Sequence, residues 1–162
     1  MCIRDRCETG IVRGAYRLTG NVNDDPPMIR LLGSGPIMKN VISASEDLNG
    51  RGITTEIWSV TSYGELRREG LEFERIKRFD PKHEGVPYVE ACFGDGVPTV
   101  AASDYIAAVP EMIQRWMKGE FLPLGTDGFG RSDTREELRR FFEVDSDSIC
   151  LLYTSDAADD LL

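Results

Sequence analysis

The chain has 162 residues and a formal net charge of −9 at pH 7. This acidic balance disfavours binding to nucleic acid or to an anionic membrane surface. No stretch approaches the apolar length of a membrane-spanning helix. The length fits one domain that can bury a hydrophobic core.

The two ends of the chain differ in character from the middle. Residues 1–6 are what part of a transposon adapter used in sequencing libraries would encode, and residues 150–162 resemble its translated reverse complement. Matches at both ends favour translated adapter over a natural mobile tail. Without these ends the chain keeps only Cys7 and Cys92, too few for a disulfide framework or a zinc site. That cysteine content indicates a reducing compartment such as the cytoplasm.

Strand and helix patterns alternate between these ends. Residues 7–27 read as a lead-in and linker, with strand character at 11–12 and a polar, proline-closed stretch at 20–27. The domain itself is expected at 28–149. The expected strands are, in chain order, residues 15–18, 28–32, 54–61, 98–103 and 121–124.

Helical periodicity separates the strands. Pro36 is favoured at the first position of a helix, and a capping box of Ser62 and Glu65 begins the next one. We expect that second helix to break near Gly70, with another helix through residues 73–79. The apolar face of the first helix comprises Ile37, Val41, Ala44 and Leu48.

The later segments are less regular. Residues 86–93 fit either a helix or a strand. Asp104 is expected to cap the following helix and Pro110 to bend or restart it. The apolar face of that helix comprises Ile106, Val109, Ile113 and Trp116. Because Pro123 cannot donate a hydrogen bond, the strand at 121–124 is expected at an edge of the sheet.

A glycine-rich run leads from the last strand into a charged helix. Asp133 stands where an N-cap residue is expected, and Glu136 is spaced to reach back to it. The apolar face of this helix comprises Leu138, Phe141 and Phe142. Strands alternating with helices along the chain predict an α/β domain of three layers with a mainly parallel sheet.

Two glycine motifs resemble cofactor sites only superficially. Gly33-Ser34-Gly35 follows a strand, but Met38 stands where a dinucleotide fingerprint has its third glycine. Gly94-Asp95-Gly96 matches the start of the metal-binding motif of thiamine diphosphate enzymes, which an asparagine downstream completes. No asparagine follows Asn49. We therefore interpret the first motif as a close approach of helix and sheet, and the second as a surface turn.

The remaining polar candidates are few. His83 is the single histidine, and without a partner nucleophile or second metal ligand it is interpreted as solvated. Cys92 lies among apolar residues and is interpreted as a small buried hydrophobe. Asp127, Arg131 and Asp133 form the best polar cluster, for which loop fixing and capping are favoured over ligand contact. From the residues alone, neither a catalytic triad nor a metal site is supported, and the domain is poor in candidate sites.

Several runs resemble, in the same order, the family of homodimeric bacterial pyruvate dehydrogenase E1 components. The most specific is Gly-Thr-Asp-Gly-Phe-Gly-Arg-Ser-Asp at 125–133. The similarity covers nearly all of residues 7–149. It implies the C-terminal domain of a transketolase-like enzyme, truncated at its C-terminus. The runs that carry the resemblance are residues 31–35, 58–63, 65–70, 86–88, 103–105, 124–135 and 142–145.

That resemblance implies a function for the parent protein. The family decarboxylates pyruvate on thiamine diphosphate and Mg²⁺, and transfers the acetyl unit to the lipoyl group of the E2 component. Because its cofactor lies between other domains, this domain is expected to support the homodimer, to bind no cofactor and to be inactive alone. Asp80 departs from the family, where histidine often precedes the proline.

Two alternatives stay open. The parent could be an E1-type dehydrogenase for another 2-oxo acid, since substrate specificity is set in other domains. The domain could also be a noncatalytic dimerisation or regulatory module. Titration with thiamine diphosphate separates a cofactor-binding domain from a supporting one.

Overall fold

The structure, a computed structural model, describes residues 7–19 and 26–151. Most of the predicted linker, residues 1–6 and residues 152–162 lie outside the described residues. One sheet with strand order β1-β3-β2-β4-β5 forms the centre, and only β1 runs antiparallel to its neighbour. The strands are β1 (Ala15–Thr19), β2 (Ile29–Gly33), β3 (Thr55–Val60), β4 (Thr99–Ala102) and β5 (Phe121–Leu124).

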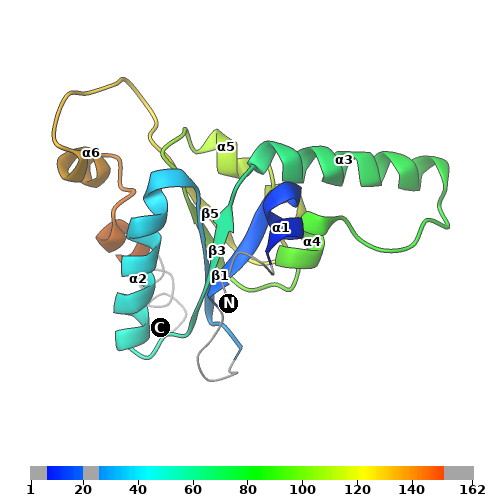
Figure 1. The fold of residues 1–162 in the computed structure, drawn as a ribbon, viewed down its shortest axis with the longest axis horizontal. Helices are drawn as coiled ribbons and strands as arrows, with labels where there is room; N and C mark the ends of the chain where they lie inside the picture. The colour runs from blue at the N-terminus through cyan, green and yellow to red at the C-terminus, as the bar shows by residue number, and fades with distance from the viewer. Residues whose placement is uncertain (1–6, 20–25, 152–162) are drawn as a thin grey trace, which may run out of the picture.

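Helices cover both faces of this sheet. In Figure 1, α2 and α6 lie on one side, whereas α1, α3 and α4 lie on the other. The predicted α/β class, with three layers and a mainly parallel sheet, is confirmed. The helical elements are α1 (Glu8–Arg13), η2 (Gly35–Ile37), α2 (Met38–Gly50), α3 (Tyr63–Phe79), α4 (Tyr88–Phe93), α5 (Ala108–Glu111), η3 (Gln114–Trp116) and α6 (Arg135–Phe141), and residues 146–151 are also helical.

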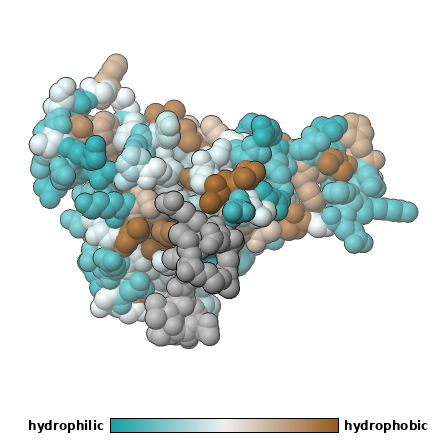
Figure 2. All heavy atoms as spheres, viewed as in Figure 1, coloured by the Kyte–Doolittle hydropathy of each residue, from teal (hydrophilic) through white to brown (hydrophobic). Residues whose placement is uncertain are grey.

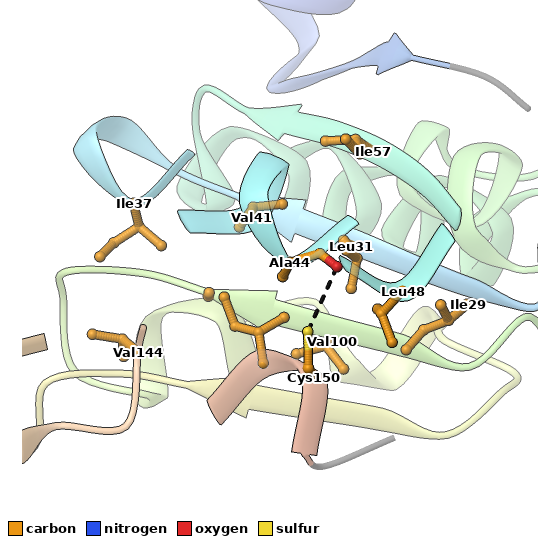
Figure 3. Close-up of a cluster of buried hydrophobic side chains, with 12 residues drawn as sticks. Ile29, Leu31, Ile37, Val41, Ala44, Leu48, Ile57, Val100, Val144 and Cys150 are labelled. Atoms are coloured by element: carbon orange, nitrogen blue, oxygen red, sulfur yellow. Dashed lines mark hydrogen bonds between the residues drawn. The ribbon is translucent and has the colours of Figure 1, made fainter. Parts of the chain in front are cut away.

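Each face of the sheet carries its own hydrophobic cluster. The cluster beneath α2 includes the predicted apolar face of that helix, all four residues being nearly inaccessible to solvent. Figure 3 shows the Cys150 side chain entering the same cluster, where its Sγ donates to the carbonyl oxygen of Ala44 at 3.6 Å. Cys150, the first residue of the predicted adapter-derived segment, therefore packs in the core.

The other cluster lies beneath α3 and α4. It includes Leu66 of α3, Phe93 of α4, and Ile113 and Trp116 from the segment after β4. Strands β2 and β4 contribute to both clusters, and every residue in these two strands is buried. Two-sided burial is why these strands read as continuous rather than alternating apolar runs.

Strand positions follow the sequence closely. All five expected strands form, and β5 lies at an edge of the sheet, as Pro123 predicted. Residues 86–93 resolve as the helix α4. Within residues 7–19 and 26–151, no helix combines the length and the apolar character needed to cross a bilayer.

The strand predicted at residues 11–12 is wrong, because these residues belong to α1. The helix ends at Gly14, which has a φ of +106° and whose N–H donates to the carbonyl oxygen of Gly10. The carbonyl oxygen of Gly14 then accepts the N–H groups of Thr61 and Ser62. These tertiary hydrogen bonds fix the end of the helix, and the high β-propensity of isoleucine and valine over only two residues does not outweigh them.

The break predicted near Gly70 is also wrong. Helix α3 continues from Ser62, whose Oγ accepts the Glu65 N–H, through to Phe79. Gly70 is buried, and its Cα faces the ring of Trp116. The glycine is therefore used for close packing and not to end the helix. In Figure 1, α3 projects well beyond the sheet, and Figure 2 shows this region largely covered by hydrophilic residues.

The segment after β4 is shorter and more broken than predicted. The four-residue α5 and the turn of η3 take the place of the expected helix. Pro110 lies within α5, consistent with the predicted interruption. Of the predicted apolar face, Ile113 and Trp116 are buried whereas Ile106 is exposed.

Candidate functional site

The sheet reverses its winding direction between β2 and β4. From β2 the chain passes over one face to β3, and from β3 it returns over the other face to β4. Open α/β sheets bind ligands outside the carboxyl ends of the strands at such a point. Ser34 follows β2 and Ser103 follows β4, and the Ser34 hydroxyl donates to Ser103 Oγ at 3.1 Å. This hydrogen bond links the ends of the two strands at the point where the winding reverses.

A pocket of about 360 Å³ opens at this edge of the sheet. The segments that follow β2, β4 and β5 form its walls, and α6 closes it from outside. Figure 1 shows the connection between β5 and α6 arching away from the sheet before α6 returns beside α2. The lining residues are Pro36, Ile37, Asp104, Thr126, Gly128, Gly130, Arg131, Arg135, Leu138, Arg139, Phe142 and Val144.

The start of the glycine-rich loop is fixed to the β4–α5 connection. The Thr126 N–H donates to the carbonyl oxygen of Tyr105 at 2.9 Å, and its hydroxyl donates to that of Asp104 at 2.7 Å. Asp127 Oδ2 then accepts the N–H of Ala107 at 3.0 Å. Two consecutive residues thus set where the loop leaves the sheet.

Two glycines in this loop have clear physical reasons. A Cβ on Gly125 would lie 2.2 Å from the backbone nitrogen of Ala107, so the two segments approach too closely for a side chain. Gly128 has a φ of +106°, a conformation that L-residues rarely adopt. The glycine-rich composition therefore follows from the path of the loop.

We expect Asp127→Ala to lower the free energy of unfolding by about 1 kcal/mol, because it removes one charge-assisted hydrogen bond to an exposed N–H group. Asp127→Asn keeps an acceptor oxygen and should lose less than half of that. Urea denaturation of the chain and both variants measures the difference. Equal losses for the two substitutions would contradict this role for the carboxylate.

Two predicted caps are displaced. The Asp104 side chain does not cap α5, and the N–H of Ala107 is satisfied by Asp127. At α6 the cap is Thr134, whose Oγ1 accepts the Glu137 N–H at 3.3 Å, one residue later than predicted. Asp133 Oδ1 accepts the N–H of Thr134 itself, so its carboxylate is used before the helix begins.

The three residues predicted as a polar cluster do not converge. Arg131 lines the pocket, with its guanidinium 3.9 Å from the ring centroid of Phe141. Asp127 and Asp133 each accept a backbone N–H and do not line the pocket. Phe141, predicted on the buried face of α6, is more than half exposed and lies beneath Arg131.

Arg135 and Arg139 are pocket residues that the sequence did not single out. Arg139 donates to the Asn40 side-chain oxygen and to the Pro36 carbonyl oxygen, both at 3.1 Å, and so ties α6 to the start of α2. Arg135 has no hydrogen-bond or ionic partner in the described part of the chain. The spacing of four that relates them to Arg131 was the available signal.

Gly94-Asp95-Gly96 forms a turn, as interpreted from the sequence. Both carboxylate oxygens of Asp95 accept from Arg30, at 3.0 and 2.6 Å, and Oδ1 also accepts the Val97 N–H. Arg30 is 2% exposed, and its Nε donates to Glu56 at 2.7 Å. Burial alone would lower the pKa of Arg30, but these two carboxylates raise it above its usual value. The turn thus anchors a buried arginine.

These contacts do not fit a metal–cofactor site. Asp95 would have to release Arg30 to become a metal ligand. In the described residues, no three side chains among His, Cys, Asp and Glu come together in a way that could hold a metal ion. The Gly-Asp-Gly turn therefore has a structural role in this chain.

Because of the ion pair between Arg30 and Asp95, part of the stability of the fold depends on pH in the acid range. Hydrogen bonds from Arg30 hold the pKa of Asp95 below its ordinary value. A depressed folded-state pKa contributes stability above the unfolded pKa of about 4, and that contribution is lost as the pH falls further. We expect Asp95→Asn to lower the urea midpoint at pH 7 and to differ less from the parent chain at pH 3. A constant difference at both pH values would contradict this.

Neither His83 nor Cys92 shows a catalytic environment. The ring of His83 packs against Phe73, with 5.1 Å between centroids. Cys92 is a partly buried member of the cluster beneath α3, and burial raises the pKa of its thiol, which disfavours the thiolate needed of a nucleophile. Cys92 was interpreted as a buried small hydrophobe, and the structure shows it packed against this cluster but only partly buried.

Comparison with known proteins identifies the family. The chain matches the family described as transketolase-like TK C-terminal domain over residues 14–145. It is 42% identical over 156 residues to the pyruvate dehydrogenase E1 component of Pseudomonas aeruginosa, covering 94% of this chain and 18% of that protein. The corresponding protein of Mycobacterium tuberculosis is 40% identical over 142 residues, covering 86% of this chain and 15% of the relative.

A solved structure agrees at the level of the fold. Transketolase from Leishmania mexicana matches with a TM-score of 0.60 and 20% sequence identity, over 89% of this chain and 18% of that one. This chain thus spans less than a fifth of the length of each relative named here. From the match over residues 14–145 and the observed fold, the chain belongs to the family of transketolase-like C-terminal domains.

Proposed function

We propose that this chain is the C-terminal domain of a pyruvate dehydrogenase E1 component and that it supports the enzyme's dimer rather than its chemistry. The observation that carries the proposal is the 42% identity to a protein of that name along 94% of this chain. The relative's name gives the parent activity, since a single domain of this size does not define one.

For the parent enzyme, the proposal specifies a complete reaction. A cytoplasmic homodimer would decarboxylate pyruvate on thiamine diphosphate and Mg²⁺ and transfer the acetyl unit to the lipoyl group of E2. The cofactor supplies the stabilised carbanion, while the protein orients it and excludes water. The residues of this chain would contribute none of the cofactor ligands, because the carboxylate of its Gly-Asp-Gly turn is engaged by Arg30.

Exposed apolar side chains support a role in assembly. Phe129 is 96% exposed at the tip of the glycine-rich loop, and Tyr105 and Ile106 are exposed on the neighbouring β4–α5 connection. Large apolar side chains exposed on two neighbouring loops are surface that a protein interface would cover. In the proposed dimer the loop residues Asp127, Arg131 and Asp133 hold this surface in shape at or beside the subunit contact.

The reading frame upstream of this fragment tests the assignment. We expect it to encode a Gly-Asp-Gly motif completed by a downstream asparagine, together with the glutamate that activates thiamine diphosphate. An upstream frame that lacks both features would refute the E1 assignment.

Amplifying the same genomic locus also tests the ends of the chain. Genomic codons for residues 1–6 and 150–162 in place there would overturn their adapter origin.

A further inference from the structure

We propose that the pocket between α2, α6 and the carboxyl ends of β2, β4 and β5 binds a small organic phosphate, a dianion attached to an apolar body. This inference is independent of the proposed function of the parent enzyme. It rests on the charge of the pocket, its apolar wall and its position in the sheet.

The pocket carries an excess of positive charge. Arg131, Arg135 and Arg139 line one pocket of a chain with a net charge of −9. Among the described residues, none of these three guanidiniums forms an ion pair with a carboxylate. Asp104 is the single acidic residue in the lining, so the pocket keeps an excess of positive charge. Such an excess favours a ligand with more than one negative charge.

The aspartates of the surrounding loop do not remove this excess. Asp127 and Asp133 both lie outside the lining, and each already accepts a backbone N–H, from Ala107 and Thr134 respectively. The loop therefore uses its acidic groups to hold its own backbone and leaves the arginines available.

The groove along α3 shows the contrasting arrangement. Four arginines line it, but three glutamates accompany them, and two of the arginines are paired with Glu65 and Glu72. The positive charge of the arginines is thus compensated by carboxylates in the groove along α3, but not in the pocket beside α6. The difference separates an ordinary solvated helix face from a candidate anion site.

Two of the three arginines are held in place. Arg139 is held by the Pro36 carbonyl oxygen and by Asn40, and Arg131 is held over the ring of Phe141. Arg135 forms no hydrogen bond, ion pair or ring contact within the described residues. Two guanidiniums are thus pre-organised and one is free to move onto a ligand, which limits the entropy lost on binding. Planar guanidiniums bind phosphate oxygens in pairs of hydrogen bonds.

The apolar part of the lining determines which kind of organic group the ligand can carry. Ile37, Leu138, Phe142 and Val144 supply apolar surface in the same lining. A volume of about 360 Å³ lies at the lower end of the range for small-molecule sites. The pocket therefore fits a compact apolar group carrying one phosphate better than it fits a dinucleotide.

The position of the pocket in the fold also points to a ligand site. Pro36 and Ile37 follow β2 and Asp104 follows β4, so the pocket lies at the point where the sheet reverses its winding direction. Ligands of open α/β sheets bind in that crevice. The location is set by topology and is independent of the charge argument.

Calorimetric titration of the 162-residue chain with phenyl phosphate at low ionic strength tests the proposal. We expect saturable binding that weakens as salt is added, and Arg135→Gln should weaken it about tenfold through loss of a charged hydrogen bond. The matched control is Arg140→Gln, which removes a guanidinium from the same helix outside the pocket lining and should change affinity less than about twofold. Arg131→Gln provides a second pocket variant with an expected loss of the same order.

Two further ligands define the chemistry. Phenol should bind far more weakly than phenyl phosphate, and benzoate, with one charge, should lie between them. Absence of saturable phenyl phosphate binding would overturn the proposal. Equal weakening by Arg140→Gln and Arg135→Gln would show nonspecific attraction and would also overturn it. Benzoate binding as tight as phenyl phosphate binding would contradict the assignment of a dianion.

Discussion

Replacement of Arg30 by methionine is expected to destabilise the fold by about 3–5 kcal/mol. Arg30 is 2% exposed and spans three elements, donating from β2 to Glu56 on β3 and to Asp95 in the turn after α4. The substitution leaves Glu56 nearly buried, with only a longer contact of 3.4 Å to Arg17. An unpaired buried carboxylate is costly because the interior cannot solvate it.

Chemical denaturation of the Arg30→Met variant measures this effect. Arg68→Met provides the matched control, because Arg68 pairs with Glu65 on the exposed face of α3. Exposed pairs three residues apart contribute little, so the control should lose less than about 0.5 kcal/mol. Similar losses for both variants would show that burial of the Arg30 network is not what stabilises the fold.

Gly70→Ala is expected to destabilise the fold by about 1–3 kcal/mol. A Cβ at this position would lie 2.5 Å from the Trp116 ring, and two further ring atoms lie within 2.9 Å. Trp116 is buried in the cluster beneath α3 and cannot move without disturbing its neighbours. Helix propensity favours alanine by about 1 kcal/mol at most, which is too little to offset the clash.

Gly64→Ala in the same helix is the control with the opposite sign. Gly64 is exposed, and the nearest atom to its added Cβ is Ser62 Oγ at 3.8 Å, an ordinary contact. We expect this variant to be neutral or stabilised by up to about 1 kcal/mol. Thermal unfolding of both variants separates the two effects. A destabilised Gly64→Ala with an unchanged Gly70→Ala would contradict the observed packing of α3 on Trp116.

The local sequence pattern was sufficient to predict the strands and the α/β class of the fold. Residues 28–32 and 98–103 are short and largely apolar, apart from the paired Arg30, because parallel strands in the middle of a sheet are buried on both faces. Pro123 correctly placed its strand at an edge, since its missing N–H constrains pairing wherever the strand lies. These features depend on the chemistry of single residues, so they are visible without tertiary information.

Features that depend on distant partners were not predictable. The sequence around Gly70 reads as a helix break because only the fold shows Trp116 filling the space beside it. Asp127 satisfies an N–H twenty residues earlier, so no local spacing indicates it. The pocket arginines likewise line a common pocket only when α6 folds back beside α2 (Figure 1). This arrangement is set by the packing of Phe142 and Val144.

The most direct test of the central claim is calorimetric titration of the folded 162-residue chain with thiamine diphosphate in the presence of Mg²⁺. A supporting domain whose Gly-Asp-Gly carboxylate is held by Arg30 should give no saturable heat, while circular dichroism confirms that the chain is folded. Saturable binding of thiamine diphosphate that is lost in Asp95→Asn would contradict the account, because it would make the turn a cofactor ligand.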